Sequence, residues 1–131
     1  DTSMAKILIV DDDYEMCALM RTWLTQAGHE VSEAHDGEEA IQMQDGDPAE
    51  IVVLDLIMPV KEGIETMSIL RRTHPNVGII AVTGGGVVSP EEHLKWAQKF
   101  GADRFMRKPF ESSELIGHVA ALEEAIGEAI R

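Results

Sequence analysis

The sequence predicts a single α/β domain in which five β-strands alternate with five helices in a doubly wound parallel sheet. Short runs of β-branched and apolar residues recur at regular spacing, and each run is followed by a segment with helical periodicity. Several runs are continuously apolar, which is typical of strands that helices cover on both faces. With 131 residues and 44% hydrophobic content, the chain is long enough for one such core and short for two.

The five expected strands cover residues 6–10, 30–34, 51–54, 77–82 and 104–106. Strands that alternate with helices connect by right-handed crossovers, so we expect them to run parallel. In such a sheet, ligands bind beyond the carboxyl ends of the strands. Candidate functional residues are therefore sought where each strand ends.

Helical periodicity fills the intervals between the strands. The first helix is expected to turn one apolar face to the core, formed by Met16, Leu19, Met20, Trp23, Leu24 and Ala27. Gly28 then ends it. A shorter helix follows Asp36, and Pro75 closes a third. A fourth is expected over 90–100 and a fifth from Ser112 to the end of the chain.

Charge and cysteine content restrict the functional classes. The chain carries 11 Lys and Arg against 24 Asp and Glu, a net charge of -13, which disfavours direct binding to nucleic acid or anionic membranes. The one cysteine, Cys17, has no disulfide partner in the chain and is expected to be a small buried hydrophobe. No Cys/His cluster has the spacing of a zinc site, so we expect no structural zinc. We therefore expect a cytoplasmic domain. The domain is expected to cover residues 4–131, and residues 1–3, which precede Met4, are interpreted as an added remnant.

Polar residues collect at the carboxyl ends of four strands. They are Asp11-Asp12-Asp13 after the first strand, Asp55 after the third, Thr83 after the fourth and Lys108-Pro109 after the fifth. The second strand ends at Ala34-His35, where we expect no chemistry. We expect the carboxylates, the hydroxyl and the ammonium to converge on one pocket.

Clustered carboxylates repel one another unless a cation or a proton compensates them. Mg²⁺ prefers oxygen ligands and is often held by one or two carboxylates together with a phosphate. An aspartate can also act as a nucleophile toward phosphorus. Lys108 and Thr83 are suited to neutralise and bind the oxygens of a phosphoryl group.

Four segments carry a resemblance to a known family. They are Ile7-Leu8-Ile9-Val10-Asp11-Asp12-Asp13, Val53-Leu54-Asp55-Leu56-Ile57-Met58-Pro59 with Gly63, Ile79-Ile80-Ala81-Val82-Thr83 and Lys108-Pro109-Phe110. In this order and spacing, the chain resembles the CheY-like receiver domain of two-component response regulators over essentially its whole length. The resemblance implies a flavodoxin-like fold with strand order 2-1-3-4-5.

The resemblance also implies a phosphoacceptor and a cofactor. Asp55 would take a phosphoryl group from a phosphohistidine on a sensor histidine kinase or a histidine phosphotransfer protein. The cofactor would be Mg²⁺, held by Asp11, Asp12, Asp55 and the backbone carbonyl of Ile57. The chain would be a signalling phosphoacceptor and not an enzyme, with at most its own phosphotransfer and autodephosphorylation.

Three more residues receive roles from the resemblance. Thr83 and Lys108 would each bind a phosphoryl oxygen, and the Lys108-Pro109 peptide bond would be cis. Phe105 would turn inward as the Thr83 hydroxyl moves toward the phosphoryl group. Asp13 is expected to open the first helix as its N-cap and not to bind metal.

The resemblance implies that phosphorylation reshapes the face formed by the fourth helix, the fifth strand and the fifth helix. That face would bind an output domain, an effector protein or, in a phosphorylation-linked dimer, a second copy. Trp96 in the fourth helix is expected to point outward, where a binding anchor and a chance surface aromatic are equally credible. Ile57 and Gly85, each two residues past a site residue, offer no side-chain hydrogen bond to an attacking water, which predicts slow dephosphorylation.

Two alternatives stay open at this level. Asp11-Asp12-Asp13-Tyr14-Glu15 has the Asp-x-Asp spacing of haloacid-dehalogenase-like Mg²⁺-dependent phosphohydrolases. A receiver-shaped binding module that is never phosphorylated is the second. The phosphoacceptor account requires that Asp11, Asp12 and Asp55 share a cation and that Asp55 meets solvent.

Overall fold

The computed structural model describes residues 4–56, 58, 60–84, 89, 91, 92, 95 and 99–130. Five parallel strands form one sheet in the order β2-β1-β3-β4-β5, which confirms the expected fold class and topology. The strands are β1 (Lys6–Val10), β2 (Glu30–Ala34), β3 (Ile51–Asp55), β4 (Gly78–Gly84) and β5 (Arg104–Lys108).

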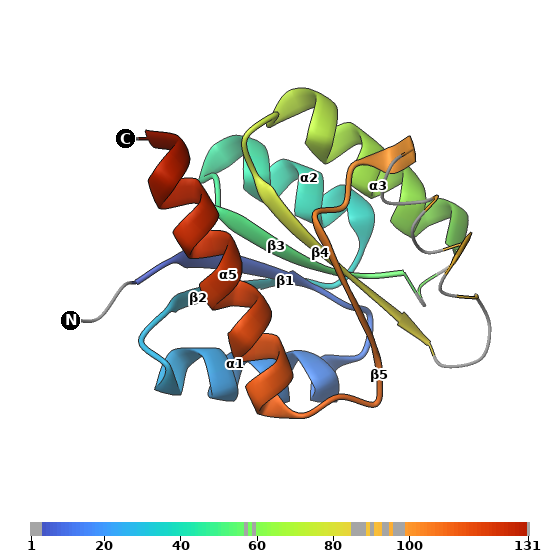
Figure 1. The fold of residues 1–131 in the computed structure, drawn as a ribbon. Coiled ribbons are helices and arrows are strands. Elements are labelled where there is room, and N and C mark those ends of the chain that lie inside the picture. Colours follow the sequence, from blue (N-terminus) through green and yellow to red (C-terminus); the bar gives the residue numbers. More distant parts are fainter. Residues whose placement is uncertain are drawn as a thin grey trace.

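Helices cover both faces of the sheet. Figure 1 shows α1 (Tyr14–Gln26) and α5 (Ser112–Ile130) on one face, with α2 (Gly37–Gly46) and α3 (Val60–Thr73) on the other. Most of the fourth helix expected over 90–100, including Trp96, lies outside the described residues. Gly101, expected just after that helix, has a φ of 93°, a conformation that favours glycine.

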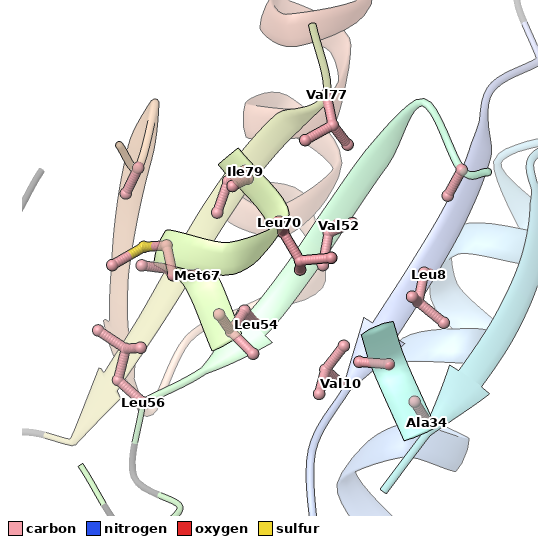
Figure 2. Packing of buried hydrophobic residues seen from close by; sticks show 14 of the residues in the cluster. Leu8, Val10, Ala34, Val52, Leu54, Leu56, Met67, Leu70, Val77 and Ile79 are labelled. Carbon is pink, nitrogen blue, oxygen red and sulfur yellow. The ribbon is translucent and has the colours of Figure 1, made fainter. Parts of the chain in front are cut away.

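Two hydrophobic layers follow from the alternation of side chains along each strand. Leu8, Val10, Val52 and Leu54 pack with residues of α2 and α3, as Figure 2 shows for that layer. The intervening residues, Ile7, Ile9, Ile51 and Val53, pack with residues of α1 and α5. Because both layers are apolar, these strands have the continuous hydrophobic sequences that predicted a doubly covered sheet.

The first helix begins and ends as predicted. A carboxylate oxygen of Asp13 accepts hydrogen bonds from the backbone N–H groups of Glu15 and Met16, at 3.0 and 3.2 Å, so Asp13 is the N-cap. Gly28 follows the helix with a φ of 99°. The cap fixes the direction in which α1 leaves the end of β1.

Leu19 is a correction to the predicted core face of α1. The helix buries a narrow stripe, Cys17, Met20 and Leu24, and leaves Leu19 45% exposed. Successive residues of an α-helix lie about 100° apart around its axis, so Leu19 points to the flank of the helix when Met20 faces the sheet. An apolar residue within the right periodicity can thus still lie beside the core.

Three strands extend further than the sequence predicted. Asp55, Thr83 and Lys108 are not in the loops after β3, β4 and β5 but among the last residues of those strands. Strand pairing continues there, with Asp55 beside Val82 and Thr83 beside Arg107. The site residues are therefore held by the sheet itself.

In the described part of the chain, no helix combines the length and the hydropathy that a bilayer crossing requires.

Candidate functional site

Asp11 is a fixed, fully buried carboxylate at the end of β1. Its backbone N–H donates to the carbonyl of Ala34 at 3.1 Å. One side-chain oxygen, Oδ1, accepts from the backbone N–H of Asp13 at 2.9 Å. The turn that caps α1 therefore also orients Asp11, whose other carboxylate oxygen faces β5.

Lys108 joins two carboxylates from different strands. Its Nζ lies 3.2 Å from Oδ2 of Asp11 and 3.3 Å from Oδ2 of Asp55. Burial of the ammonium lowers the pKa of Lys108, but the negative charges of Asp55 and Asp11 outweigh it, so the pKa is raised above its ordinary value. Lys108 is thus a permanent positive charge at neutral pH.

The three acidic residues expected to share a cation do lie together. Oxygen atoms of Asp11, Asp12 and Asp55 are all within 4.8 Å of one another. Asp12 is exposed, whereas the other two carboxylates are buried. Three oxygen donors with one side open to solvent fit a hard cation such as Mg²⁺, which retains several waters. Ile57, expected to add a backbone carbonyl, lies outside the described residues.

Asp55 is less accessible than the phosphoacceptor account requires. The residue is 2% exposed, so the expectation that it meets solvent is wrong for this conformation. Asp55 ends a central strand whose residues are buried throughout, and the Lys108 ammonium lies against its carboxylate. Of the three clustered carboxylates, only that of Asp12 is open to solvent.

Thr83 and Phe105 lie on adjacent strands. Thr83 is buried, and its hydroxyl donates to the carbonyl of Met106 at 3.5 Å, a long hydrogen bond. Phe105 pairs with Ala81 across the ladder and is half-buried against the layer that contains α3. At this length the bond holds the Thr83 hydroxyl only weakly. The Lys108-Pro109 peptide bond is cis, as expected.

The structure also reveals a group of ligand-type side chains that sequence reasoning missed. Atoms of Cys17, Glu33 and His35 lie within 4.8 Å of one another, next to the end of β2. We expected no chemistry at this strand end and a purely hydrophobic role for Cys17. Cys17 is indeed buried, yet its thiol donates to the carbonyl of Asp11 at 3.3 Å. The sequence did contain one signal for this group: Glu33 and His35 are two residues apart at the end of a strand, a spacing that puts both side chains on the same face.

Fold and site together define a class: a doubly wound α/β domain with an acidic pocket and a lysine at the carboxyl edge of its sheet. A family model described as the response regulator receiver domain matches residues 7–120. The chain therefore belongs to the receiver domains of two-component response regulators.

Relatives agree with this assignment. The transcriptional regulatory protein CpxR of Escherichia coli strain K12 is 38% identical over 119 residues, which are 91% of this chain and 49% of CpxR. The transcriptional regulatory protein TcrA of Mycobacterium tuberculosis H37Rv is 34% identical over 120 residues, 92% of this chain and 46% of TcrA. The chain thus spans about half the length of the curated relatives it matches.

Solved receiver domains share the fold. The receiver domain of the Francisella response regulator 1452 matches with a TM-score of 0.82 and 30% identity, covering 92% of this chain and 98% of that one. A CheY-like receiver domain from Methanospirillum hungatei matches with a TM-score of 0.84 and 28% identity, covering 96% and 99%. These matches favour a receiver over the haloacid-dehalogenase-like alternative.

Proposed function

We propose that Asp55 accepts a phosphoryl group from a phosphohistidine of a sensor histidine kinase or a phosphotransfer protein, and that Asp11, Asp12 and Asp55 hold Mg²⁺ for this reaction. The observation that carries the proposal is the convergence of the three carboxylates with Lys108 at one edge of the sheet.

In the proposed step, a carboxylate oxygen of Asp55 forms a bond to phosphorus while the bond between phosphorus and the donor nitrogen breaks. The imidazole keeps the electron pair of the broken bond and leaves. Bound Mg²⁺ supplies positive charge to the transferred oxygens and to the crowded carboxylates. The Asp11 hydrogen bond from Asp13 and the strand position of Asp55 fix the two buried carboxylates in place.

Lys108 gives the pocket its second cation. When Asp55 becomes an acyl phosphate, the Lys108 ammonium stays within reach of the new phosphoryl oxygens while it keeps its contact with Asp11. The Thr83 hydroxyl then exchanges its long bond to the Met106 carbonyl for a shorter, charge-assisted bond to phosphate. Phe105, on the strand next to Thr83, turns inward in the same event.

The proposed output is a change in the surface that includes β5 and α5. CpxR and TcrA are named as transcriptional regulatory proteins. We therefore infer that phosphorylation at Asp55 alters contact with an effector of gene regulation or with a second copy of the chain. The proposed phosphodonor places the domain in the cytoplasm, and the free Cys17 is in keeping with a reducing setting.

The test is the intact mass of the protein after incubation with acetyl phosphate, with and without Mg²⁺. We expect one added phosphoryl group in the wild type with Mg²⁺, none with the metal chelated and none in Asp55→Asn. The adduct should persist for minutes or longer after the donor is removed, because Ile57 does not orient an attacking water.

Two results would overturn the proposal. An unmodified wild-type protein would favour the inert binding module. Continuous release of inorganic phosphate, many times per chain and unaffected by Asp55→Asn, would favour a phosphohydrolase.

A further inference from the structure

Outside the acidic pocket, Cys17, Glu33 and His35 form a second cluster of metal-ligand side chains. Cys17 lies in α1, Glu33 near the end of β2 and His35 just after that strand. One ligand atom from each residue lies within 4.8 Å of the other two. None of the three ligand side chains belongs to the Asp11, Asp12 and Asp55 set, although the Cys17 thiol contacts the backbone carbonyl of Asp11.

Neighbouring groups orient two of the three side chains. Oε2 of Glu33 accepts from Nη1 of Arg21 at 2.6 Å, while Oε1 faces Nε2 of His35 at 3.3 Å. The other ring nitrogen of His35, Nδ1, lies 3.5 Å from a carboxylate oxygen of Glu39. A metal-binding histidine characteristically directs one nitrogen to the ion and the other to a carboxylate. The His35 ring already has this orientation.

The cluster is supported and accessible. The Tyr14 ring stacks on the His35 ring, with centroids 3.9 Å apart and planes inclined by 17°. The side chains of His35 and Glu33 are 23% and 18% exposed, whereas Cys17 is buried beneath them. His35 and Glu33 are thus the solvent-facing members of the cluster, and the sulfur of Cys17 is the innermost.

We propose that Cys17, Glu33 and His35 bind a divalent ion of the Zn²⁺ class, with the fourth position open to water. Thiolate, imidazole and carboxylate are the ligand types of Zn²⁺, whereas Mg²⁺ takes oxygen ligands. The sulfur and nitrogen donors distinguish this site from the acidic pocket. On binding, the sulfur of Cys17 exchanges its proton for the metal, the proton passes to solvent, and the hydrogen bond to the Asp11 carbonyl is lost.

Titration of the full chain with Co²⁺, a spectroscopic substitute for Zn²⁺, tests the proposal. We expect a thiolate-to-cobalt charge-transfer band, together with the intense visible bands of tetrahedral Co²⁺, and both should disappear when Zn²⁺ is added. Cys17→Ala should remove the charge-transfer band, and His35→Gln should remove tight binding. Glu39→Gln keeps an oxygen that can accept from the backbone N–H of His35 but removes the charge behind the ring, and it should weaken binding by about 10- to 100-fold.

Two control variants separate this site from others. Asp12→Asn weakens the acidic pocket and should leave the cobalt spectrum unchanged. His74→Gln removes another histidine that lies beside a carboxylate, Asp45, and should also change nothing. Because Cys17 is buried, far-ultraviolet circular dichroism should verify that Cys17→Ala is folded. If Cys17→Ala is unfolded, His35→Gln tests the site instead, because His35 is more exposed and its substitution disturbs the core less.

The proposal is overturned if wild-type protein with Co²⁺ shows no charge-transfer band, or if the band survives Cys17→Ala. It is also overturned if cobalt binding is lost in Asp12→Asn and kept in His35→Gln. Those outcomes concern this cluster alone and leave phosphorylation at Asp55 to its own test.

Discussion

The ammonium of Lys108 lies 3.3 Å from a carboxylate oxygen of Asp55, although 53 positions separate the two residues in the sequence. The same ammonium lies 3.2 Å from Asp11. One positive charge thus serves two buried carboxylates, with the exposed Asp12 beside them. In the absence of metal, the pocket holds more negative than positive charge.

Asp55→Asn should therefore stabilise the metal-free protein. The amide removes one negative charge but still offers an oxygen to Lys108, which keeps its pair with Asp11. We expect a gain of roughly 1 to 3 kcal/mol in the free energy of unfolding, because the amide relieves the repulsion between carboxylates, which is worth about 1 to 4 kcal/mol for like charges about 4 Å apart at a partly solvated site. Urea unfolding of both proteins in chelator measures the change, and a less stable Asp55→Asn would contradict this description of the pocket.

Mg²⁺ should stabilise the wild type in proportion to its occupancy. A free Mg²⁺ concentration of 100 times the dissociation constant should raise the free energy of unfolding by about 2.7 kcal/mol. We expect the thermal midpoint of unfolding to rise accordingly. Asp12→Asn should lose most of this rise. Asp13→Asn is the matched control, because asparagine also caps a helix well and Asp13 is not among the clustered ligands. Equal responses of the two variants to Mg²⁺ would exclude Asp12 as a ligand.

The strand ends show how far the sequence alone could predict the site. The order of strands and helices follows from local patterns, and four polar strand ends placed Asp11, Asp55, Thr83 and Lys108 at one edge. Their contacts depend on register, which pairs Asp55 with Val82 and Gly84 with Lys108. Register is set by packing between distant segments, so the burial of Asp55 was not predictable from its neighbours in sequence.

Gly37 lies where α2 approaches α3 closely. A Cβ atom added to Gly37 would overlap the Oγ1 atom of Thr66 and would lie 3.3 Å from the Cβ atom of Thr66. Gly37→Ala should therefore destabilise the fold by roughly 1 to 3 kcal/mol, as overpacking does. Gly117→Ala in α5, where an added Cβ meets nothing within 4 Å, should stabilise it by roughly 0.5 to 1 kcal/mol. The two free energies of unfolding in urea should change in opposite directions, and a stable Gly37→Ala would disprove the close contact.

His118 on α5 should make stability depend on pH. Nε of Arg104 donates to Nδ1 of His118 at 2.7 Å, and Glu114 lies 4.0 Å from Nε2. Burial and the Arg104 charge lower the pKa of His118, although Glu114 opposes them. The unfolded state therefore binds the proton more readily. The stability that the neutral ring contributes is present above about pH 6.5 and is lost as pH falls through the lower, folded pKa.

The measurement is the urea midpoint at about pH 7.5 and about pH 5.5, on either side of the ordinary histidine pKa. The wild type should lose more stability on acidification than His118→Gln does. An identical loss in the wild type and His118→Gln would show that protonation of His118 carries no such cost.

Side-chain clusters made across elements were the least predictable features. The expectation that Cys17 is a small buried hydrophobe is correct as far as burial goes. Its approach to Glu33 and His35 depends on how α1 lies against β2, which no local pattern specifies. Leu19 shows the opposite error. Its apolar side chain and its spacing predicted burial, but the helix is oriented so that Leu19 is 45% exposed.

The central claim is that Asp55, and neither Asp11 nor Asp12, carries the phosphoryl group. Borohydride reduces an acyl phosphate to an alcohol, so reduction followed by peptide mass spectrometry identifies the modified carboxylate. We predict a reduced side chain at position 55 in wild-type protein treated with acetyl phosphate and Mg²⁺, with unmodified peptides at 11 and 12. Reduction at Asp11 or Asp12 with an unmodified Asp55 would contradict the account.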